Sequence, residues 1–280
     1  MIEPRFVDAN GLRFGYLEQG RGPLVLLAHG FPDTAYTWDQ ALPAFAQAGY
    51  RAVAPFLRGY APSELAPDGA YDTDTLARDL LALIEALGEA RAVVIGHDWG
   101  ASAGYGAAAI GGDRVRLLIP MAIPHPRSIR PTPRLLWAGR HMLRLRMPDA
   151  AAKVRRDGFA YVDELWRRWS PQWADLPATE TAAVKRAFRQ PGSVEAACAY
   201  YRTIGLRGPR SHEPAIRVPT VAFAGEADVV ATRAFEKARH CFAGPYQVVA
   251  VPGGHFMHRE HPDEVIPELV RVVRDFDRAR

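Results

Sequence analysis

Short apolar segments recur along the chain between turn-forming residues. Seven of them have the length of a β-strand: Leu12–Leu17, Leu24–Ala28, Ala52–Pro55, Ala92–Ile95, Leu117–Ile119, Thr220–Ala224 and Gln247–Val251. Runs that are apolar at successive positions are typical of strands buried on both faces, as in a parallel sheet covered by helices. The pattern therefore predicts a largely parallel sheet.

Helical periodicity falls between several of these segments. Residues Thr73–Leu87 place leucine and isoleucine side chains on one face and stop before Gly88. Residues Asp263–Ala279 repeat an amphipathic pattern near the end of the chain. An alternation of strands and helices predicts an α/β fold with a doubly wound, mostly parallel sheet.

One long stretch interrupts this alternation. Between residues 125 and 217 no strand-like run occurs, four of the six tryptophans lie there, and prolines cluster at both ends. We interpret the stretch as a helical domain inserted between two core strands. The predicted division is a core made of residues 1–124 and 216–280, with a helical cap domain made of residues 125–215.

The composition narrows the class of protein. The chain has 280 residues, of which 48% are hydrophobic and 24% charged, which is typical of globular proteins. No apolar run approaches the roughly 20 residues of a membrane span, and the first residues lack a secretory signal pattern. With only two cysteines, Cys198 and Cys241, and no Cys/His spacing typical of metal sites, we expect a cytoplasmic protein without a metal, a cofactor or a membrane partner.

The small net charge of +4 hides an uneven distribution. Residues 125–217 hold 18 Lys and Arg against 8 Asp and Glu, whereas the rest of the chain holds 17 against 23. Attraction between a basic helical domain and an acidic core could help to seat one on the other. Because no run of like charges and no RNA-binding motif occurs, we expect no nucleic-acid partner, and a homo-oligomer remains open.

The strongest chemical signal is Gly96-His97-Asp98-Trp99-Gly100, which follows an apolar strand and precedes a helix of small residues. A strand, a tight turn and a helix are the context of a nucleophile elbow, with Asp98 at the position where hydrolases more often carry serine. A helix N-terminus also favours a carboxylate. An ordinary glycine-rich turn with an aspartate cap would have the same sequence pattern. The motif therefore indicates a catalytic site only together with other catalytic residues.

Candidate catalytic residues of this kind follow three other predicted strands. The segment His29-Gly30-Phe31-Pro32 lies where this architecture supplies an oxyanion amide, so the amides of Phe31 and Trp99 form a predicted pair. Asp228 and then His255 complete the order nucleophile, acid, histidine. We expect His255 to activate water and Asp228 to fix its tautomer, with Glu226 as a rival acid.

Together these motifs resemble the α/β-hydrolase family, and within it the epoxide hydrolases. The resemblance implies an α/β-hydrolase fold with an inserted helical cap domain. It also implies that Asp98 attacks an epoxide carbon to form an alkyl ester, which water activated by His255 then hydrolyses to a vicinal diol. The implied partners are a small epoxide, apolar or aromatic in view of the tryptophans, and water.

The family usually supplies two cap tyrosines that donate to the leaving oxygen. Tyr201 matches one of them because it stands in Tyr200-Tyr201-Arg202. His141 stands where the other tyrosine is expected, and an imidazole can also donate a proton. Tyr161 is an alternative to His141 for this role.

Two other functions remain to be weighed. Haloalkane dehalogenases share the aspartate nucleophile, and Trp99 would suit a halide, but Phe31 stands where they commonly carry asparagine. A non-catalytic ligand-binding protein of the same fold would be expected to lack a catalytic group, whereas Asp98, Asp228 and His255 are all present. The six histidines outside the predicted site are expected to be structural or surface residues: His97, His125, His212, His240, His258 and His261.

Overall fold

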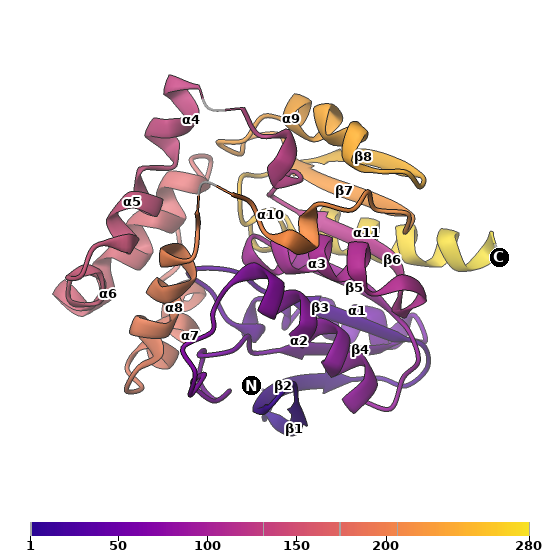
Figure 1. Cartoon of the computed structure of the whole chain (residues 1–280), viewed down its shortest axis with the longest axis horizontal. Coiled ribbons are helices and arrows are strands. Elements are labelled where there is room, and N and C mark those ends of the chain that lie inside the picture. The colour runs from indigo at the N-terminus through magenta and orange to yellow at the C-terminus, as the bar shows by residue number, and fades with distance from the viewer. Residues whose placement is uncertain (1, 131, 174, 206, 280) are drawn as a thin grey trace.

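A computed structural model describes residues 2–130, 132–173, 175–205 and 207–279. Its strands form one sheet of eight members in the order β1-β2-β4-β3-β5-β6-β7-β8 (Figure 1). Their bounds are β1 Arg5–Ala9, β2 Leu12–Gln19, β3 Leu24–Ala28, β4 Arg51–Pro55, β5 Ala92–His97, β6 Val115–Met121, β7 Thr220–Gly225 and β8 Tyr246–Val251.

The sheet is parallel from β4 through β8 and antiparallel at its first edge. Strands β4, β3, β5, β6, β7 and β8 pair in parallel, while β1 pairs with β2, and β2 with β4, in antiparallel fashion. The central strands β3 and β5 are buried at every position, which explains their unbroken apolar sequence. All seven predicted strands are present, and the predicted doubly wound α/β sheet is confirmed.

Helices cover both faces of the sheet. Helices α2 and α3 pack together on one face, and α1 and α11 on the other (Figure 1). Asp72 caps the first turn of α2 by accepting from the Thr75 amide at 2.9 Å, and Gly88, with φ 83°, follows the helix. The helices outside the β6–β7 connection are α1 Ala41–Gln47, α2 Thr73–Ala86, α3 Trp99–Ile110, α9 Thr232–Lys237, α10 Met257–Glu260 and α11 Pro262–Arg278.

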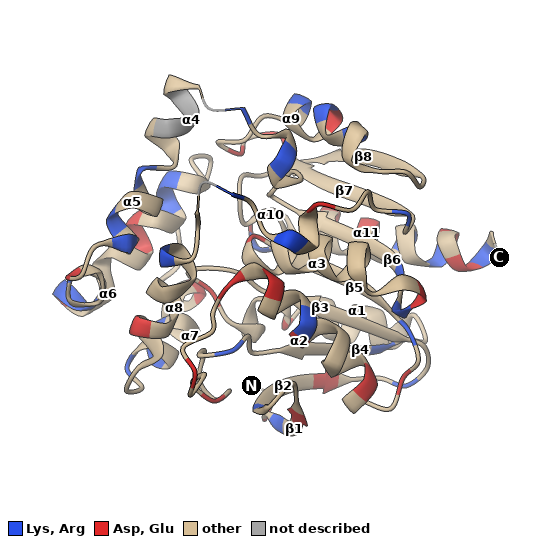
Figure 2. Cartoon of the chain, in the orientation of Figure 1, with Lys and Arg blue, Asp and Glu red and all other residues tan. Residues whose placement is uncertain are grey.

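Among the described residues, five helices lie between β6 and β7, where the sequence pattern predicts a helical insertion. They are α4 Pro133–Ala138, α5 Arg140–Arg146, α6 Ala150–Trp169, α7 Ala178–Phe188 and α8 Ser193–Arg202. They form a group at one side of the sheet, with many Lys and Arg side chains on α5 and α6 (Figure 2). Residues 131, 174 and 206 of this stretch lie outside the described residues, and the division into core and cap domains stays a prediction.

The N-terminal strand β1 is absent from the predicted elements. Its sequence, Arg5-Phe6-Val7-Asp8-Ala9, mixes charged and apolar residues because it lies at an edge of the sheet and is partly exposed. Among the helices of the described residues, none combines the length and the apolar character needed to cross a membrane.

Candidate active site

Asp98 lies at the turn between the end of β5 and the start of α3. Its backbone has φ 52° and ψ −114°, a conformation that costs energy for any residue with a side chain. The reversal brings α3 so close to β3 that a Cβ atom on Gly100 would overlap the backbone of Ala28. Glycine at position 100 therefore allows the tight turn, and the strained turn holds the Asp98 side chain at the edge of the sheet.

The two carboxylate oxygens of Asp98 have different neighbours. Oδ1 accepts a hydrogen bond from the main-chain amide of Phe31 at 2.8 Å, and Oδ2 lies 3.7 Å from Nε2 of His255. Gly30 leaves room for this arrangement because a Cβ atom there would collide with the carboxylate. Burial raises the pKa of Asp98, but His255 outweighs it, so the pKa lies below its ordinary value and the group is ionised.

His255 lies between two carboxylates. Its Nδ1 atom lies 3.2 Å from Oδ2 of Asp228, and the Asp228 side chain is fully buried. Burial alone would lower the pKa of His255, but the charges of Asp228 and Asp98 raise it to about 10. Glu226, the rival acid, is exposed, so the structure pairs His255 with Asp228 and not with Glu226.

Tyr201 of α8 faces the predicted oxyanion residues. Its ring centroid lies 5.2 Å from the rings of both Phe31 and Trp99, in edge-to-face contact, and only 2% of the residue is exposed. Burial, together with the charge of Asp98, raises the pKa of Tyr201 well above its ordinary value, so the hydroxyl keeps its proton.

The two candidates for the second proton donor differ in where their protons are. The His141 ring centroid lies 5.7 Å from that of Tyr201 and 4.6 Å from that of Trp169. Because a carbonyl can only accept, Nδ1 of His141 donates to the Ala138 carbonyl at 3.3 Å, and burial lowers the pKa of His141 to about 4. Neutral His141 therefore has no proton on Nε2 in this arrangement, whereas the Tyr161 hydroxyl is buried and its proton is not used by another described group.

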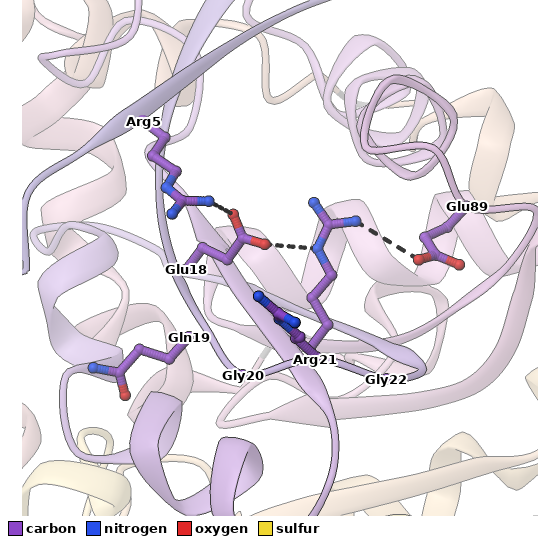
Figure 3. A pocket seen from close by; sticks show the side chains of 8 residues that line it. Arg5, Glu18, Gln19, Gly20, Arg21, Gly22 and Glu89 are labelled. Carbon is purple, nitrogen blue, oxygen red and sulfur yellow. Dashed lines mark hydrogen bonds and ion pairs between the residues drawn. The ribbon is translucent and has the colours of Figure 1, made fainter.

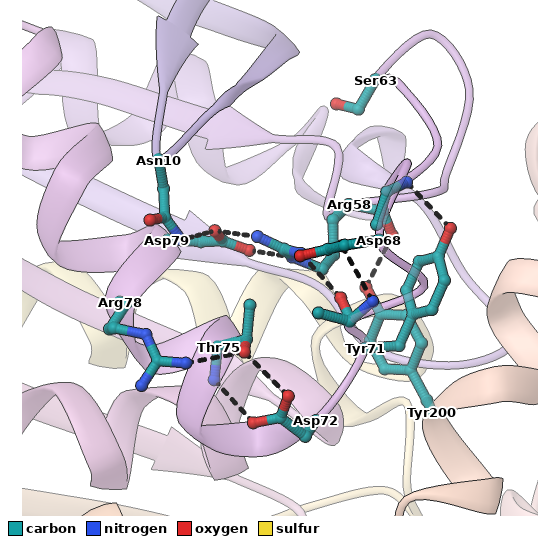
Figure 4. Close-up of polar contacts among 12 residues, drawn as sticks. Asn10, Arg58, Ser63, Asp68, Tyr71, Asp72, Thr75, Arg78, Asp79 and Tyr200 are labelled. Atoms are coloured by element: carbon teal, nitrogen blue, oxygen red, sulfur yellow. Dashed lines mark hydrogen bonds and ion pairs between the residues drawn. The ribbon is translucent and has the colours of Figure 1, made fainter.

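A buried ion pair supports the helix that carries Tyr201. Arg58 donates two hydrogen bonds to Asp79 of α2, at 2.5 and 2.6 Å, and a third to the Ala70 carbonyl at 2.6 Å (Figure 4). The carbonyl of Arg58 in turn accepts from the Tyr200 hydroxyl at 2.7 Å. The loop after β4 is thus held by α2 and itself holds α8, one residue away from Tyr201.

Sequence reasoning missed one cluster beside this site. Asp33, His97 and His258 are buried, and atoms able to bind a metal lie within 4.8 Å of one another. Their spacing along the chain resembles no known metal motif. The available signal was their position, because each lies within four residues of a predicted site motif and these motifs meet at one edge of the sheet.

A pocket lies far from the candidate active site. It has a volume of about 330 Å³ and is lined by residues at the turn after β2, among them Arg5, Glu18, Arg51 and Glu89 (Figure 3). Their charges satisfy one another, since Glu18 accepts from Arg5 and from Arg51 at 2.7 Å each. Gln19 pairs with Ala52 near the start of β4, whereas Asp98 follows the end of β5. The pocket therefore lies near the amino ends of the parallel strands, and Asp98 lies at their carboxyl ends.

Comparison with known proteins agrees with this fold. Residues 25–268 match the model of the alpha/beta hydrolase family, so the chain belongs to that family. It is 32% identical to epoxide hydrolase A of Mycobacterium tuberculosis and 30% identical to the AB hydrolase superfamily protein YfhM of Bacillus subtilis, each over 96% of both chains. Its structure resembles the crystal structure of a Bacillus megaterium epoxide hydrolase in complex with an inhibitor, with a TM-score of 0.84, 25% identity, and coverage of 97% of this chain and 99% of the other.

Proposed function

We propose that the protein hydrolyses an epoxide to a vicinal diol through an ester on Asp98. The observation that carries this proposal is the arrangement of Asp98 itself. One oxygen is held by the Phe31 amide, the other lies 3.7 Å from Nε2 of His255, and the Tyr201 ring packs against Phe31 beside them. Epoxide hydrolase A of Mycobacterium tuberculosis, which aligns with 96% of this chain, supports the same reaction.

In the first step Oδ2 of Asp98 attacks an epoxide carbon. A bond forms between Oδ2 and carbon, the carbon–oxygen bond of the ring breaks, and the electron pair stays on the leaving oxygen. Tyr201 donates its proton to that oxygen, with His141 or Tyr161 as the second donor. A carboxylate suits this reaction because it can displace a leaving group at saturated carbon and leaves an ester that water can cleave.

In the second step His255 takes a proton from water, and the hydroxide attacks the carbonyl carbon of the ester. The bond from that carbon to Oδ2 then breaks, Oδ2 leaves as part of the diol with the proton of the added hydroxyl, and the proton on His255 returns to Tyr201. Oδ1 becomes the carbonyl oxygen, and it already accepts from the Phe31 amide, so the developing oxyanion is stabilised from the start. The Trp99 amide, next in the chain after Asp98, is the second proposed donor. Esterification removes the Asp98 charge that helps to keep His255 protonated, so the pKa of His255 falls after the first step, and more of the imidazole is neutral and able to take a proton from water.

The same contacts favour an epoxide over a haloalkane. A departing halide needs N–H donors and no acid, whereas an opened epoxide leaves as an alkoxide and needs a proton. Tyr201 lies against Phe31 and Trp99 and its hydroxyl keeps its proton, so a proton is available for that alkoxide. The aromatic rings of Phe31, Trp99 and Tyr201 around Asp98 further favour an apolar or aromatic epoxide.

A single-turnover experiment in ¹⁸O-labelled water tests the proposal. With enzyme in excess over styrene oxide, the ester route gives a diol that carries ordinary oxygen from Asp98, and the ¹⁸O enters the protein at that residue. Direct attack of water would label the diol in the first turnover and would overturn the ester. Release of halide from 1-chlorobutane or 1-bromobutane without hydrolysis of styrene oxide or of aliphatic epoxides would instead identify a dehalogenase.

A further inference from the structure

Three polar side chains meet behind the catalytic histidine. Asp33 follows β3, His97 is the last residue of β5, and His258 lies in α10. They are 3%, 0% and 1% exposed, and atoms capable of binding a metal lie within 4.8 Å of one another. The ring centroid of His97 lies 4.9 Å from those of both His255 and His258, so the cluster adjoins the active site.

The hydrogen bonds around the cluster fix where its protons lie. Nε2 of His97 lies 2.9 Å from the His255 carbonyl, which can only accept, so neutral His97 carries its proton on Nε2 and has a lone pair on Nδ1. Nε2 of His258 lies 2.7 Å from the Thr37 hydroxyl. Where the Thr37 hydroxyl accepts from Nε2 of His258, Nδ1 of His258 carries a lone pair as well.

In this arrangement three buried hydrogen-bond acceptors face one another. Oδ2 of Asp33, Nδ1 of His97 and Nδ1 of His258 are all buried and have no hydrogen-bond partner among the described residues. Facing lone pairs repel one another, and unsatisfied buried polar atoms are costly. One proton on Asp33 would serve one of the two nitrogens, and one water molecule donates to two acceptors at most. A single cation among them would satisfy all three.

We propose that Asp33, His97 and His258 bind one divalent transition-metal ion of the zinc class. Two neutral imidazoles and a carboxylate are a donor set that zinc accepts, and a fourth position remains for a water molecule. Ligand atoms around a tetrahedral zinc ion stand about 3.4 Å apart, so side-chain rotations must close the cluster from its present spread. This inference goes beyond the proposed hydrolysis, for which the metal is not needed.

The surroundings tolerate the added charge. The charge of Arg259 acts on Asp33, and Arg259 is already paired with Glu180 at 2.8 Å and with Asp39. The ion would join the loop after β3 to α10. Through the bond from Nε2 of His97 to the His255 carbonyl, it would also fix the backbone of the catalytic histidine. We therefore assign the site a structural and positioning role.

Metal binding is tested directly with the full-length protein. After removal of metals with a chelator, the protein is incubated with Zn²⁺, dialysed, and its zinc content is measured by elemental analysis. We expect close to one zinc ion per chain, a rise of several degrees in the melting temperature, and with Co²⁺ the intense visible absorption of a four-coordinate ion. The variants His258→Gln and Asp33→Asn should retain at least tenfold less zinc, whereas His240→Gln, at an exposed histidine, should retain the wild-type amount.

Either of two results overturns the proposal. The first is wild-type protein that, after refolding in the presence of Zn²⁺, holds no zinc above background and gives no cobalt spectrum. The second is zinc that persists in folded His258→Gln protein but disappears in His240→Gln protein, which would place it at the surface. Because the wild-type measurements do not depend on a variant, misfolding of a variant leaves the test intact.

Discussion

The main-chain amide of Phe31 donates to Oδ1 of Asp98 at 2.8 Å, across 67 positions of sequence. In the proposed mechanism, this bond decides which oxygen of Asp98 attacks the epoxide. Oδ1 is held in the place of a future carbonyl oxygen, so Oδ2, which lies 3.7 Å from His255, is left to form the ester. The carboxylate is thus oriented for both steps of the proposed reaction before substrate arrives.

The substitution Asp98→Asn should abolish turnover while preserving the fold. The side-chain carbonyl oxygen of the introduced asparagine can still accept from the Phe31 amide, but its amide nitrogen is not a nucleophile. We expect kcat to fall by roughly 10³-fold or more. Intact mass must confirm that the introduced asparagine has not reverted to aspartate by deamidation. Wild-type turnover by a confirmed Asp98→Asn protein would mean that Asp98 is not the nucleophile.

The ring-opening donors can be ranked by removing one proton source at a time. Tyr201→Phe keeps the edge-to-face contacts with Phe31 and Trp99 but loses the hydroxyl, and it should slow ester formation by about 10²-fold or more. If Tyr161 is the second donor, Tyr161→Phe should have a similar effect and His141→Gln a smaller one. Rapid-quench measurement of the ester separates this step from hydrolysis. The reverse ranking of these two variants would assign the role to His141, and three near-neutral variants would contradict donation from the helices between β6 and β7.

The buried Arg58–Asp79 pair should contribute strongly to stability. Arg58→Ala leaves the Asp79 carboxylate almost fully buried without its main partner, which costs about 3–5 kcal/mol of the free energy of unfolding. Urea unfolding followed by circular dichroism measures this cost. Arg271→Ala is the control because Arg271 also bonds to two carboxylates, Glu268 and Asp275, but at the surface. Equal losses of unfolding free energy in the two variants would show that the buried position of Arg58 adds no stability beyond that of a surface ion pair.

Buried neutral histidines should make the fold sensitive to acid. Burial lowers the pKa of His29 to about 4 and that of His125 to about 3, below the ordinary 6.5 of an unfolded chain. The unfolded chain therefore takes up protons first, so this stability is complete above pH 6.5 and declines as the pH falls towards 4. Each such histidine can add about 1.4 kcal/mol per pH unit to the slope.

Unfolding free energies at several pH values between 7.5 and 4.5 test that slope. His125→Phe removes one titrating group from an aromatic environment beside Tyr105 and Phe242, so it should flatten the pH dependence even if it changes the stability at pH 7.5. His240→Gln, at an exposed histidine, should leave the slope unchanged. A wild-type free energy that stays level between pH 7 and pH 5 would be inconsistent with this prediction.

Much of the sheet could be predicted from the sequence because its central strands are buried on both faces. Every position of β3 and β5 is buried, so their continuous apolar sequence directly reflects their environment. The edge strand β1 has no such apolar run because four of its five residues are exposed or only partly buried. The order Asp98, Asp228, His255 was likewise predictable because each residue follows a strand that the pattern identifies.

The contacts that depend on three-dimensional packing were not predictable. Nothing in the sequence around His141 indicates that its Nδ1 proton is used by the Ala138 carbonyl. The meeting of Asp33, His97 and His258 also depends on three segments that converge only after the sheet has formed. Separations of 64 and 161 positions carry no periodic signal, and sequence reasoning assigned both histidines to structural or surface roles.

The central claim is a covalent bond between Asp98 and substrate, and intact mass spectrometry of His255→Gln tests it most directly. Without the imidazole the ester should form and persist, because no base activates water. After incubation with styrene oxide, we predict a mass increase equal to the whole epoxide, located on the peptide that contains Asp98 and absent from the double variant with Asp98→Asn. A folded His255→Gln protein that gains no mass while the wild-type protein turns the same epoxide into diol would contradict the account.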